Sequence, residues 1–453
     1  MPDYSTNRHF ESAKTLEAYN LHKKNNDQYS PDSNSEVLYY LDMGMLNHYI
    51  GNYELSNEML SNAENAIEKN FTKSLSTLAI SLLIDDRSLD YSGEDYEDVY
   101  LNVFKALNYY KLDKFDEALV EIRRVNEKLK NLNDKYNRLA YSLNQTRERK
   151  KRFTWSKVKF YASPLASYLS FLFYCAKGQY DDARIDIENT VKAYKNQNQI
   201  YDFQVPQHIL QKFQCIRKEN PEECLFQKNL AKLNVITFIG RTPEKKEKTY
   251  WAISQKNKVI ISKRKDKKHS IDVIPWPEMP AGYYIKFSVP YMEAKKTNIN
   301  KIKLFVDDNY IEMVKLDDLS SVATYTFDTK KNLIYLKTFI RSVLKGIAAK
   351  KLRDKINNLG RKELPKLDFL FNTGKDILIG LTLGSIEHAD TRISSFFPGC
   401  AYVSEVNIKP GIYNIALKYY GHNNQIIKTT NFGKQKITEK GINLFTSSFF
   451  SNK

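Results

Sequence analysis

Apolar positions recur at helical spacing through the first half of the chain. The clearest run follows Ser163, where Leu165, Leu169 and Leu172 share one helical face until Gly178 interrupts the pattern. A serine followed by proline favours a helix start, and glycine can adopt the left-handed conformation that ends a helix. A second amphipathic run follows at once, so this stretch predicts two antiparallel helices joined by a tight turn.

The turn and small residues of this hairpin have the spacing typical of a tetratricopeptide repeat. Gly178, Tyr180 and Ala183 fall where such a repeat has its turn glycine, its aromatic residue and the small residue at the helix crossing. The same offsets recur around Gly51, and a more degenerate copy has Asp113 in place of the turn glycine. Unrelated helix pairs with similar turns are the alternative. The predicted hairpins lie near 37–69, 99–132 and 164–195, in a helical repeat domain over 1–230.

From about residue 234 the pattern changes to a period of two, which is typical of strands. The second domain is expected over 231–453, with strands over 234–327, a long helical pair over 330–389 and strands over 399–450. Its last strands are expected to form a hairpin around Gly433 and Gly441. The predicted fold class is therefore α+β, with an N-terminal α-helical hairpin solenoid before a β-rich domain.

Charge changes this picture only slightly. The formal net charge of +17 suggests nucleic-acid binding, but the aromatic-plus-basic motifs of RNA-recognition domains are missing, which disfavours that class. The densest basic run, KRKDKKH, begins at Lys263 and ends at His269 between two strand patterns. A solvated hairpin tip explains it most simply, and contact with an anionic membrane surface is the sharper alternative.

The sequence shows neither a membrane-spanning run nor a secretion signature in its first residues, MPDYSTNRHF. Four cysteines are too few for a disulfide framework. Cys215 and Cys224 could nevertheless close a small loop if the compartment is oxidising.

Motifs for catalysis, cofactors or metals were sought and not found. The sequence has no glycine-rich phosphate loop, His-Glu-x-x-His helix, Cys-x-x-Cys pair or nucleophile elbow, so no catalytic residue, cofactor, metal or small-molecule substrate is predicted. His388, Asp390 and Arg392 form one candidate polar cluster. It could be an acid–base or ligand-binding group, but capping and pairing at a helix end is the favoured interpretation.

A candidate interaction groove follows from the first helix of each hairpin, which faces the concave side in tetratricopeptide repeats. An apolar face of this size would be costly if exposed in a soluble monomer. We therefore expect an element of the same chain to cover it, either the helix over 7–24 or the helix over 333–356, with a partner protein as the alternative. The groove residues are Leu41, Met45, His48, Val103, Leu107, Tyr110, Tyr168 and Leu172.

Several segments carry a family resemblance. They are LDMGMLNHYIGNYELSNEML, YSGEDYEDVYLNVFKALNYY and SPLASYLSFLFYCAKGQYDDAR in the hairpins, then HADTR and IKPGIYNIALKY. With these segments the chain resembles a bacterial envelope family, often lipoproteins, in which tetratricopeptide-like hairpins precede a β-rich domain. The resemblance implies an envelope or periplasmic location and no known reaction. A lipid-accepting cysteine behind a leader is not visible, so a cytoplasmic location is the alternative.

Taken together, the sequence favours a non-catalytic scaffold that binds proteins whose identity it does not reveal. An enzyme or ligand-binding protein with a site near the 388–392 cluster is the alternative, and nucleic-acid binding through the basic surface is a third, weaker candidate.

Overall fold

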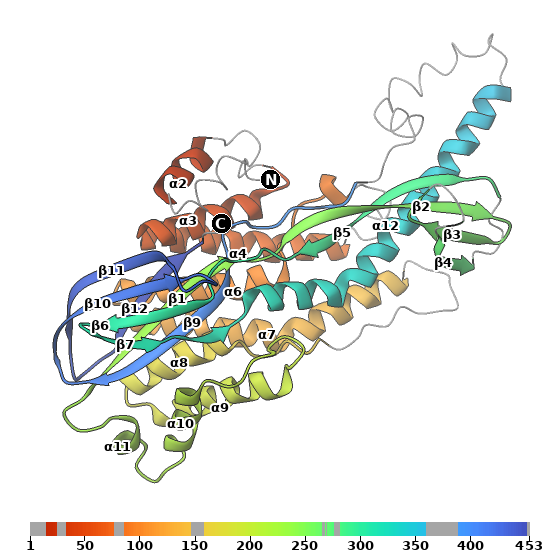
Figure 1. Cartoon of the computed structure of the whole chain (residues 1–453). Coiled ribbons are helices and arrows are strands. Elements are labelled where there is room, and N and C mark those ends of the chain that lie inside the picture. Colours follow the sequence, from red (N-terminus) through yellow and green to blue (C-terminus); the bar gives the residue numbers. More distant parts are fainter. Residues whose placement is uncertain are drawn as a thin grey trace.

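The computed structural model describes residues 15–24, 33–76, 86–145, 158–264, 268, 270–275, 281–358 and 388–450. Helices form the first part of the chain and strands dominate after residue 230, with one long helix between strands (Figure 1). The expected α+β class is therefore confirmed.

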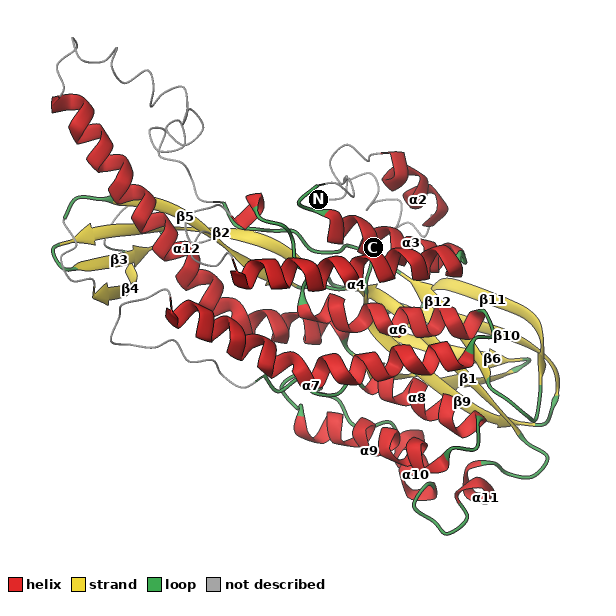
Figure 2. Cartoon of the chain, turned by 180° about the vertical axis from the view of Figure 1, so that it is seen from behind, coloured by secondary structure: helices red, strands yellow, loops and turns green. Residues whose placement is uncertain are grey.

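The helical part is built mainly from three pairs of neighbouring helices, α3/α4, α6/α7 and α8/α9, which lie side by side (Figure 2). The helices are α2 (Thr15–Lys24), α3 (Glu36–Ile50), α4 (Tyr53–Ser76), the 3-10 turn η1 (Asp86–Ser88), α6 (Asp95–Lys111), α7 (Phe115–Gln145), α8 (Pro164–Ala176), α9 (Tyr180–Asn196), α10 (Gln207–Cys215) and α11 (Pro221–Leu225).

The turns of these pairs follow from the residues that the sequence provides. Gly51 and Gly178 have φ values of 89° and 70°, which place them in the left-handed region that favours glycine. Asp113 takes the same conformation in the middle pair, with φ of 58°. At the first crossing, a Cβ added to Gly44 would lie 2.6 Å from the Leu60 side chain, so only glycine allows α3 and α4 to approach so closely.

The strands within the described residues form three four-stranded sheets. Sheet A has the order β12-β1-β9-β8, sheet B β4-β3-β2-β5 and sheet C β11-β10-β6-β7. The strands are β1 (Ala231–Arg241), β2 (Glu244–Gln255), β3 (Lys258–Ser262), β4 (Ser270–Pro275), β5 (Tyr284–Glu293), β6 (Lys301–Val306), β7 (Asn309–Glu312), β8 (Val314–Asp317), β9 (Pro398–Ile408), β10 (Gly411–Tyr420), β11 (Ile426–Ile437) and β12 (Asn443–Phe449).

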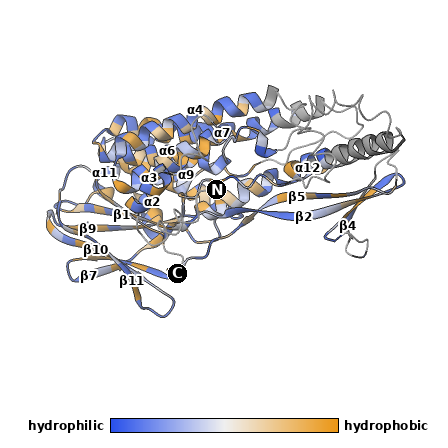
Figure 3. Cartoon of the chain, turned by 90° about the horizontal axis from the view of Figure 1, so that it is seen from above, coloured by the Kyte–Doolittle hydropathy of each residue, from blue (hydrophilic) through white to orange (hydrophobic). Residues whose placement is uncertain are grey.

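Sheet A lies between the helices and sheet C, so this end of the molecule has three layers (Figure 3). On β1, Ile236 and Phe238 belong to the core shared with the helices, whereas Leu233 and Val235 belong to the core shared with sheet C. Because both faces are covered, β1 is buried along nearly its whole length.

The expected final hairpin is wrong. β11 pairs with β10 in sheet C, but β12 crosses to sheet A and pairs in parallel with β1. Leu444 of β12 packs in the core shared with the helices. Pairing with β11 in sheet C would not give β12 this apolar contact. A strand pattern alone does not distinguish these two partners.

The long helix α12 (Leu319–Asn358) begins eleven residues earlier than expected. Leu319, Val322, Ala323 and Phe327 are all 0% exposed, and their spacing is helical, although LSSVATYTF has the composition of a strand. Asp318 stabilises the helix start, because its Oδ1 accepts a hydrogen bond from the Ser321 N–H at 2.9 Å. The second helix of the expected pair lies outside the described residues.

Sheet B and α12 form an arm that extends away from the three-layered end (Figure 1). Phe339 of α12 packs on Phe287 of β5, with ring centroids 6.0 Å apart. β3 and β4 flank the basic run over 263–269 and pair in an antiparallel arrangement, as the predicted hairpin requires, while most of the run itself lies outside the described residues.

Candidate functional site

The predicted groove residues lie on α3, α6 and α8 and are covered. Tyr110 is half-buried, and the other groove residues are at most 8% exposed. The set comprises Leu41, Met45, His48, Val103, Leu107, Tyr110, Tyr168 and Leu172. The structure therefore brings them into the protein core.

Sheet A covers this inner face. The ring of Phe104 on α6 lies 5.3 Å from that of Phe238 on β1. The hydroxyl of Tyr168 donates to Asn234 Oδ1 at 3.0 Å, and that of Tyr110 accepts from the Leu444 N–H at 3.2 Å. The chain's own strands therefore fill the groove, as expected of a self-covered face.

The covering element differs from the expected one. α2 packs against α3 at the edge of the helical layer, while Phe339 of α12 packs on sheet B (Figure 1). A broad apolar face across three helix pairs needs a comparably broad partner, and a sheet provides one where a single helix provides only a stripe.

His48 is a core residue in this arrangement. Its Nδ1 lies 2.6 Å from Asn108 Oδ1, and its ring meets that of Phe104 edge-on at 5.0 Å. Burial lowers the pKa of His48 to about 4, so the imidazole is neutral at physiological pH. It has no free face for a ligand.

The predicted polar cluster separates into two parts. Asp390 and Arg392 form a bidentate pair, with both N–O distances at 2.9 Å. Arg392 also donates to the backbone carbonyls of Asn34, Asp86 and Leu89 at 2.8 to 2.9 Å. His388 instead contacts Glu247 at 3.3 Å. The expected pairing of Asp390 with Arg392 is confirmed, whereas the helix end that they would cap lies outside the described residues.

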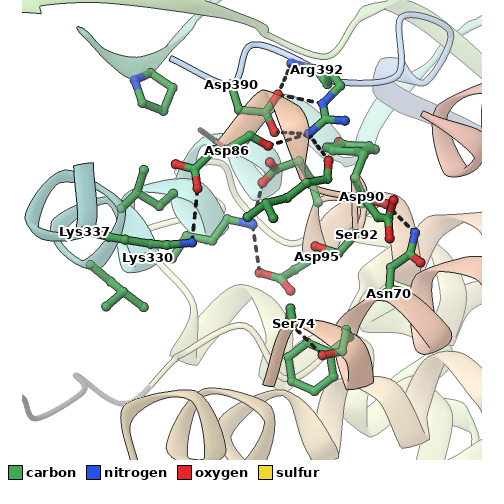
Figure 4. A pocket seen from close by; sticks show the side chains of 18 of the residues that line it. Asn70, Ser74, Asp86, Asp90, Ser92, Asp95, Lys330, Lys337, Asp390 and Arg392 are labelled. Atoms are coloured by element: carbon green, nitrogen blue, oxygen red, sulfur yellow. Dashed lines mark hydrogen bonds and ion pairs between the residues drawn. The ribbon is translucent and has the colours of Figure 1, made fainter. Parts of the chain in front are cut away.

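Asp390 and Arg392 line a cavity of about 330 Å³ (Figure 4). Its other walls come from the end of α4, the segment over 86–95, α7, β2, β5 and α12. Side chains of both charges line it: Lys73, Lys135, Lys245, Lys330, Lys337 and Arg392 face Asp86, Asp90, Glu94, Asp95 and Asp390. This cavity is the candidate functional site.

Glu94 and Asp95, at the start of α6, form the centre of an ion-pair network. Glu94 lies 2.6 Å from both Lys245 of β2 and Lys330 of α12, and Lys330 is also 3.6 Å from Asp95. Lys135 of α7 lies 2.9 Å from Asp95. Burial raises the pKa of each carboxyl, but the neighbouring lysine charges outweigh it and lower both pKa values overall.

A second ion-pair group holds α12 about two to three turns after Lys330. Arg341 donates to both carboxylate oxygens of Asp86, at 2.9 and 2.8 Å, and Lys337 donates to Asp86 Oδ1 at 3.1 Å. Burial opposes ionisation, but these contacts lower the pKa of Asp86 to about 2. Together with the network at Glu94 and Asp95, this group ties the arm to the helices, and we name the two groups the ionic clamp.

The chemistry of the clamp favours structure over catalysis. General acid–base catalysis needs a group whose pKa lies near the working pH. The pKa values of Asp86, Glu94 and Asp95 are lowered and that of Lys330 is raised, so ion pairing stabilises their charged forms. These four groups therefore hold elements together.

Asp42 of α3 binds Ser394 and Ser395, which follow Arg392 in the segment that leads to β9. Its Oδ1 accepts from the Ser394 hydroxyl at 2.6 Å and the Ser395 N–H at 3.2 Å, while its Oδ2 is buried without a partner among the described residues. Burial raises the pKa of Asp42 to about 7. A raised folded-state pKa contributes stability that is full below the unfolded pKa, about 4, and is lost as the pH rises to about 7.

Asp42→Asn should remove this pH dependence, because an amide resembles the protonated acid in shape and charge. Relative to the wild type, the free energy of unfolding of the variant should rise by roughly 2–3 kcal/mol between pH 5 and pH 8. Urea unfolding at several pH values measures the difference. A difference that stays constant over this range would contradict the raised pKa.

Sequence reasoning missed most of the clamp. The segment DDRSLDYSGEDYED is visibly acidic, and this was the available signal for Asp86, Glu94 and Asp95. Two of their cationic partners, Lys245 and Lys330, lie in EKKEK and TKK stretches that resemble many others in a lysine-rich chain. Which lysines become buried depends on contacts far apart in sequence.

No protein-family model matches the chain, and no curated protein is significantly similar to it. Among the described residues, no group of histidine, cysteine, aspartate and glutamate side chains has the arrangement of a metal site. The helices within the described ranges are also too short or too polar to cross a bilayer.

Proposed function

We propose that this protein is a non-catalytic scaffold of the bacterial cell envelope, built on tetratricopeptide-like hairpins that act as a platform for its own strands. The observation that carries the proposal is the burial of the hairpins' inner face under sheet A. A repeat protein that recognises peptides keeps this face open. Here protein partners would instead meet the outer surfaces or the arm.

The repeat assignment is supported by turn geometry and close crossings. Gly51, Asp113 and Gly178 have left-handed backbone conformations at the three turns, Gly44 lies at the crossing of α3 and α4, and Ala183 of α9 is fully buried. In tetratricopeptide repeats a small residue at this position lets the two helices of a pair cross closely.

The envelope location is supported by the cysteines as well as by the family resemblance. Cys215 and Cys224 form a disulfide that closes the loop between α10 and α11, with Cα atoms 5.3 Å apart. Disulfides persist in oxidising compartments and are rare in the cytosol. Cys175 is buried with a pKa raised to about 12 by burial, so it is an unreactive internal thiol.

Protein isolated from its own cells without reductant should contain this disulfide. Mass spectrometry should give a mass lower by two hydrogens than that of the reduced chain, with Cys175 and Cys400 remaining free thiols as internal controls. In the chain-entropy model this short loop contributes on the order of 3 kcal/mol or less, and Cys215→Ser should remove that contribution.

Cell fractionation should recover the protein with the envelope. Free thiols at both positions together with a cytosolic location would contradict the proposal.

The cavity supports a second candidate, a ligand-binding protein or enzyme whose site includes Asp390 and Arg392. Its volume of about 330 Å³ falls within the range of small-molecule sites. Native mass spectrometry of the protein from its own cells distinguishes the two: a retained small molecule favours the second candidate, and the mass of the chain alone favours the scaffold.

A further inference from the structure

The outer face of sheet C carries a surface that none of the functions above uses. Sheet C packs one face against sheet A through Leu304, Ile415 and Leu417, and its other face points away from the body (Figure 3). Directly paired residues of neighbouring antiparallel strands lie on the same face. The pairs Phe305–Ala416 and Lys303–Lys418 therefore lie on the outer face.

Lysines dominate this face. The register places Lys301 and Lys303 of β6 beside Lys418 of β10, and pairs β10 with Lys434 and Lys436 of β11. Among the described residues, Glu312 is the carboxylate that the same register places on this face, 3.7 Å from Lys301. Asp307 and Asp308 lie at its rim, in the β6–β7 turn. The face therefore carries a clear excess of positive charge.

Aromatic rings hold two of these ammonium groups in place without neutralising them. Lys303 Nζ lies 3.8 Å from the centre of the Tyr310 ring, and Lys418 Nζ lies 4.2 Å from that of Phe305. A ring face attracts a cation but leaves its charge available to an anion. Lys303 and Lys418 are thus held in position, and neither pairs with a carboxylate among the described residues.

Large apolar side chains lie exposed at the edges of this charged area. Ile412 and Ile426, near the two ends of β10, are 68% and 54% exposed, and Tyr310 is 57% exposed. Exposed aliphatic and tyrosine side chains around lysines are typical of surfaces that rest in the headgroup region of a bilayer.

We propose that the outer face of sheet C binds bilayer surfaces that carry anionic headgroups. A broad sheet face that presents lysines with apolar side chains at its edges matches a planar anionic surface, where each lysine adds to the attraction. Single-stranded nucleic acid fits less well, because it needs open aromatic rings for stacking, whereas lysines cover the Tyr310 and Phe305 rings. The proposal concerns a different surface from the hairpins and does not depend on the scaffold function.

Vesicle co-sedimentation of the full chain tests this proposal. The wild type should bind vesicles made of equal parts phosphatidylglycerol and phosphatidylcholine, and not vesicles of phosphatidylcholine alone. Raising the ionic strength from about 0.1 M to about 0.5 M should weaken binding. The double variant Lys303→Glu, Lys418→Glu should lower the partition coefficient at least tenfold.

A matched control reverses two charges elsewhere. Lys256 and Lys258 are exposed beside the β2–β3 turn of the arm, so Lys256→Glu, Lys258→Glu should leave binding within about twofold. If the Lys303 and Lys418 variant fails to fold by circular dichroism, Lys434→Glu, Lys436→Glu on the exposed edge strand β11 replaces it.

Three results would overturn the proposal. The first is equal binding to both vesicle types or binding to neither. The second is an equal loss in the Lys256 and Lys258 control, which would place the contact on the arm. The third is a wild type that binds an oligothymidylate but not anionic vesicles, with the oligothymidylate binding lost in the Lys303 and Lys418 variant.

Discussion

Lys330→Met should destabilise the protein by roughly 3–5 kcal/mol, because it leaves the charges of Glu94 and Asp95 buried without their shared partner. The Lys330 side chain is 15% exposed, and those of Glu94 and Asp95 are 5% and 3% exposed. Although burial lowers the pKa of Lys330, the charges of Asp95 and Glu94 raise it overall, which shows how strongly the site stabilises the cation. Methionine keeps the volume and removes the charge.

Urea unfolding of the purified variant measures this loss. Lys331→Met is the matched control, because Lys331 is 39% exposed and pairs with Asp328 within the same helix. The control should change the free energy of unfolding by about 0.5 kcal/mol or less. Equal stability of Lys330→Met and Lys331→Met would show that the clamp does not stabilise the fold.

Local chemistry was sufficient to predict the helix pairs. The turn positions Gly51, Asp113 and Gly178 determine where one helix ends and the next begins, and this information lies within a few residues. Most strands could be predicted for the same reason, since alternation along β6 and β10 reports directly which face is buried.

What could not be predicted depends on contacts between distant residues. LSSVATYTF has the composition of a strand, yet burial of Leu319, Val322 and Phe327 makes it helical. The pairing of β12 with β1 joins residues about two hundred positions apart, as Leu233 with Asn443, and no local pattern specifies such a partner.

The candidate site shows the same division. Burial of the groove residues could be predicted from their apolar character, but the identity of their cover could not, because sheet A assembles from strands scattered over 231–449. Asp390 and Arg392 stood out because opposite charges lie two residues apart. Lys330 did not, because its partners are more than two hundred residues away.

The central claim is that the hairpins are a platform covered by their own chain, and unfolding of Leu107→Asp tests it most directly. Leu107 lies on the inner face of α6 and is 0% exposed. An aspartate there would be a buried, unpaired charge, so the isolated protein should lose roughly 3 kcal/mol or more.

Val120→Asp is the control, because Val120 lies on α7 of the same helix pair and is 43% exposed. It should change the free energy of unfolding by about 1 kcal/mol or less. Thermal and urea unfolding of the two purified variants should therefore differ widely. If Leu107→Asp instead melts like the wild type but no longer retains a protein partner from cells, the inner face is an open receptor and the platform account is wrong.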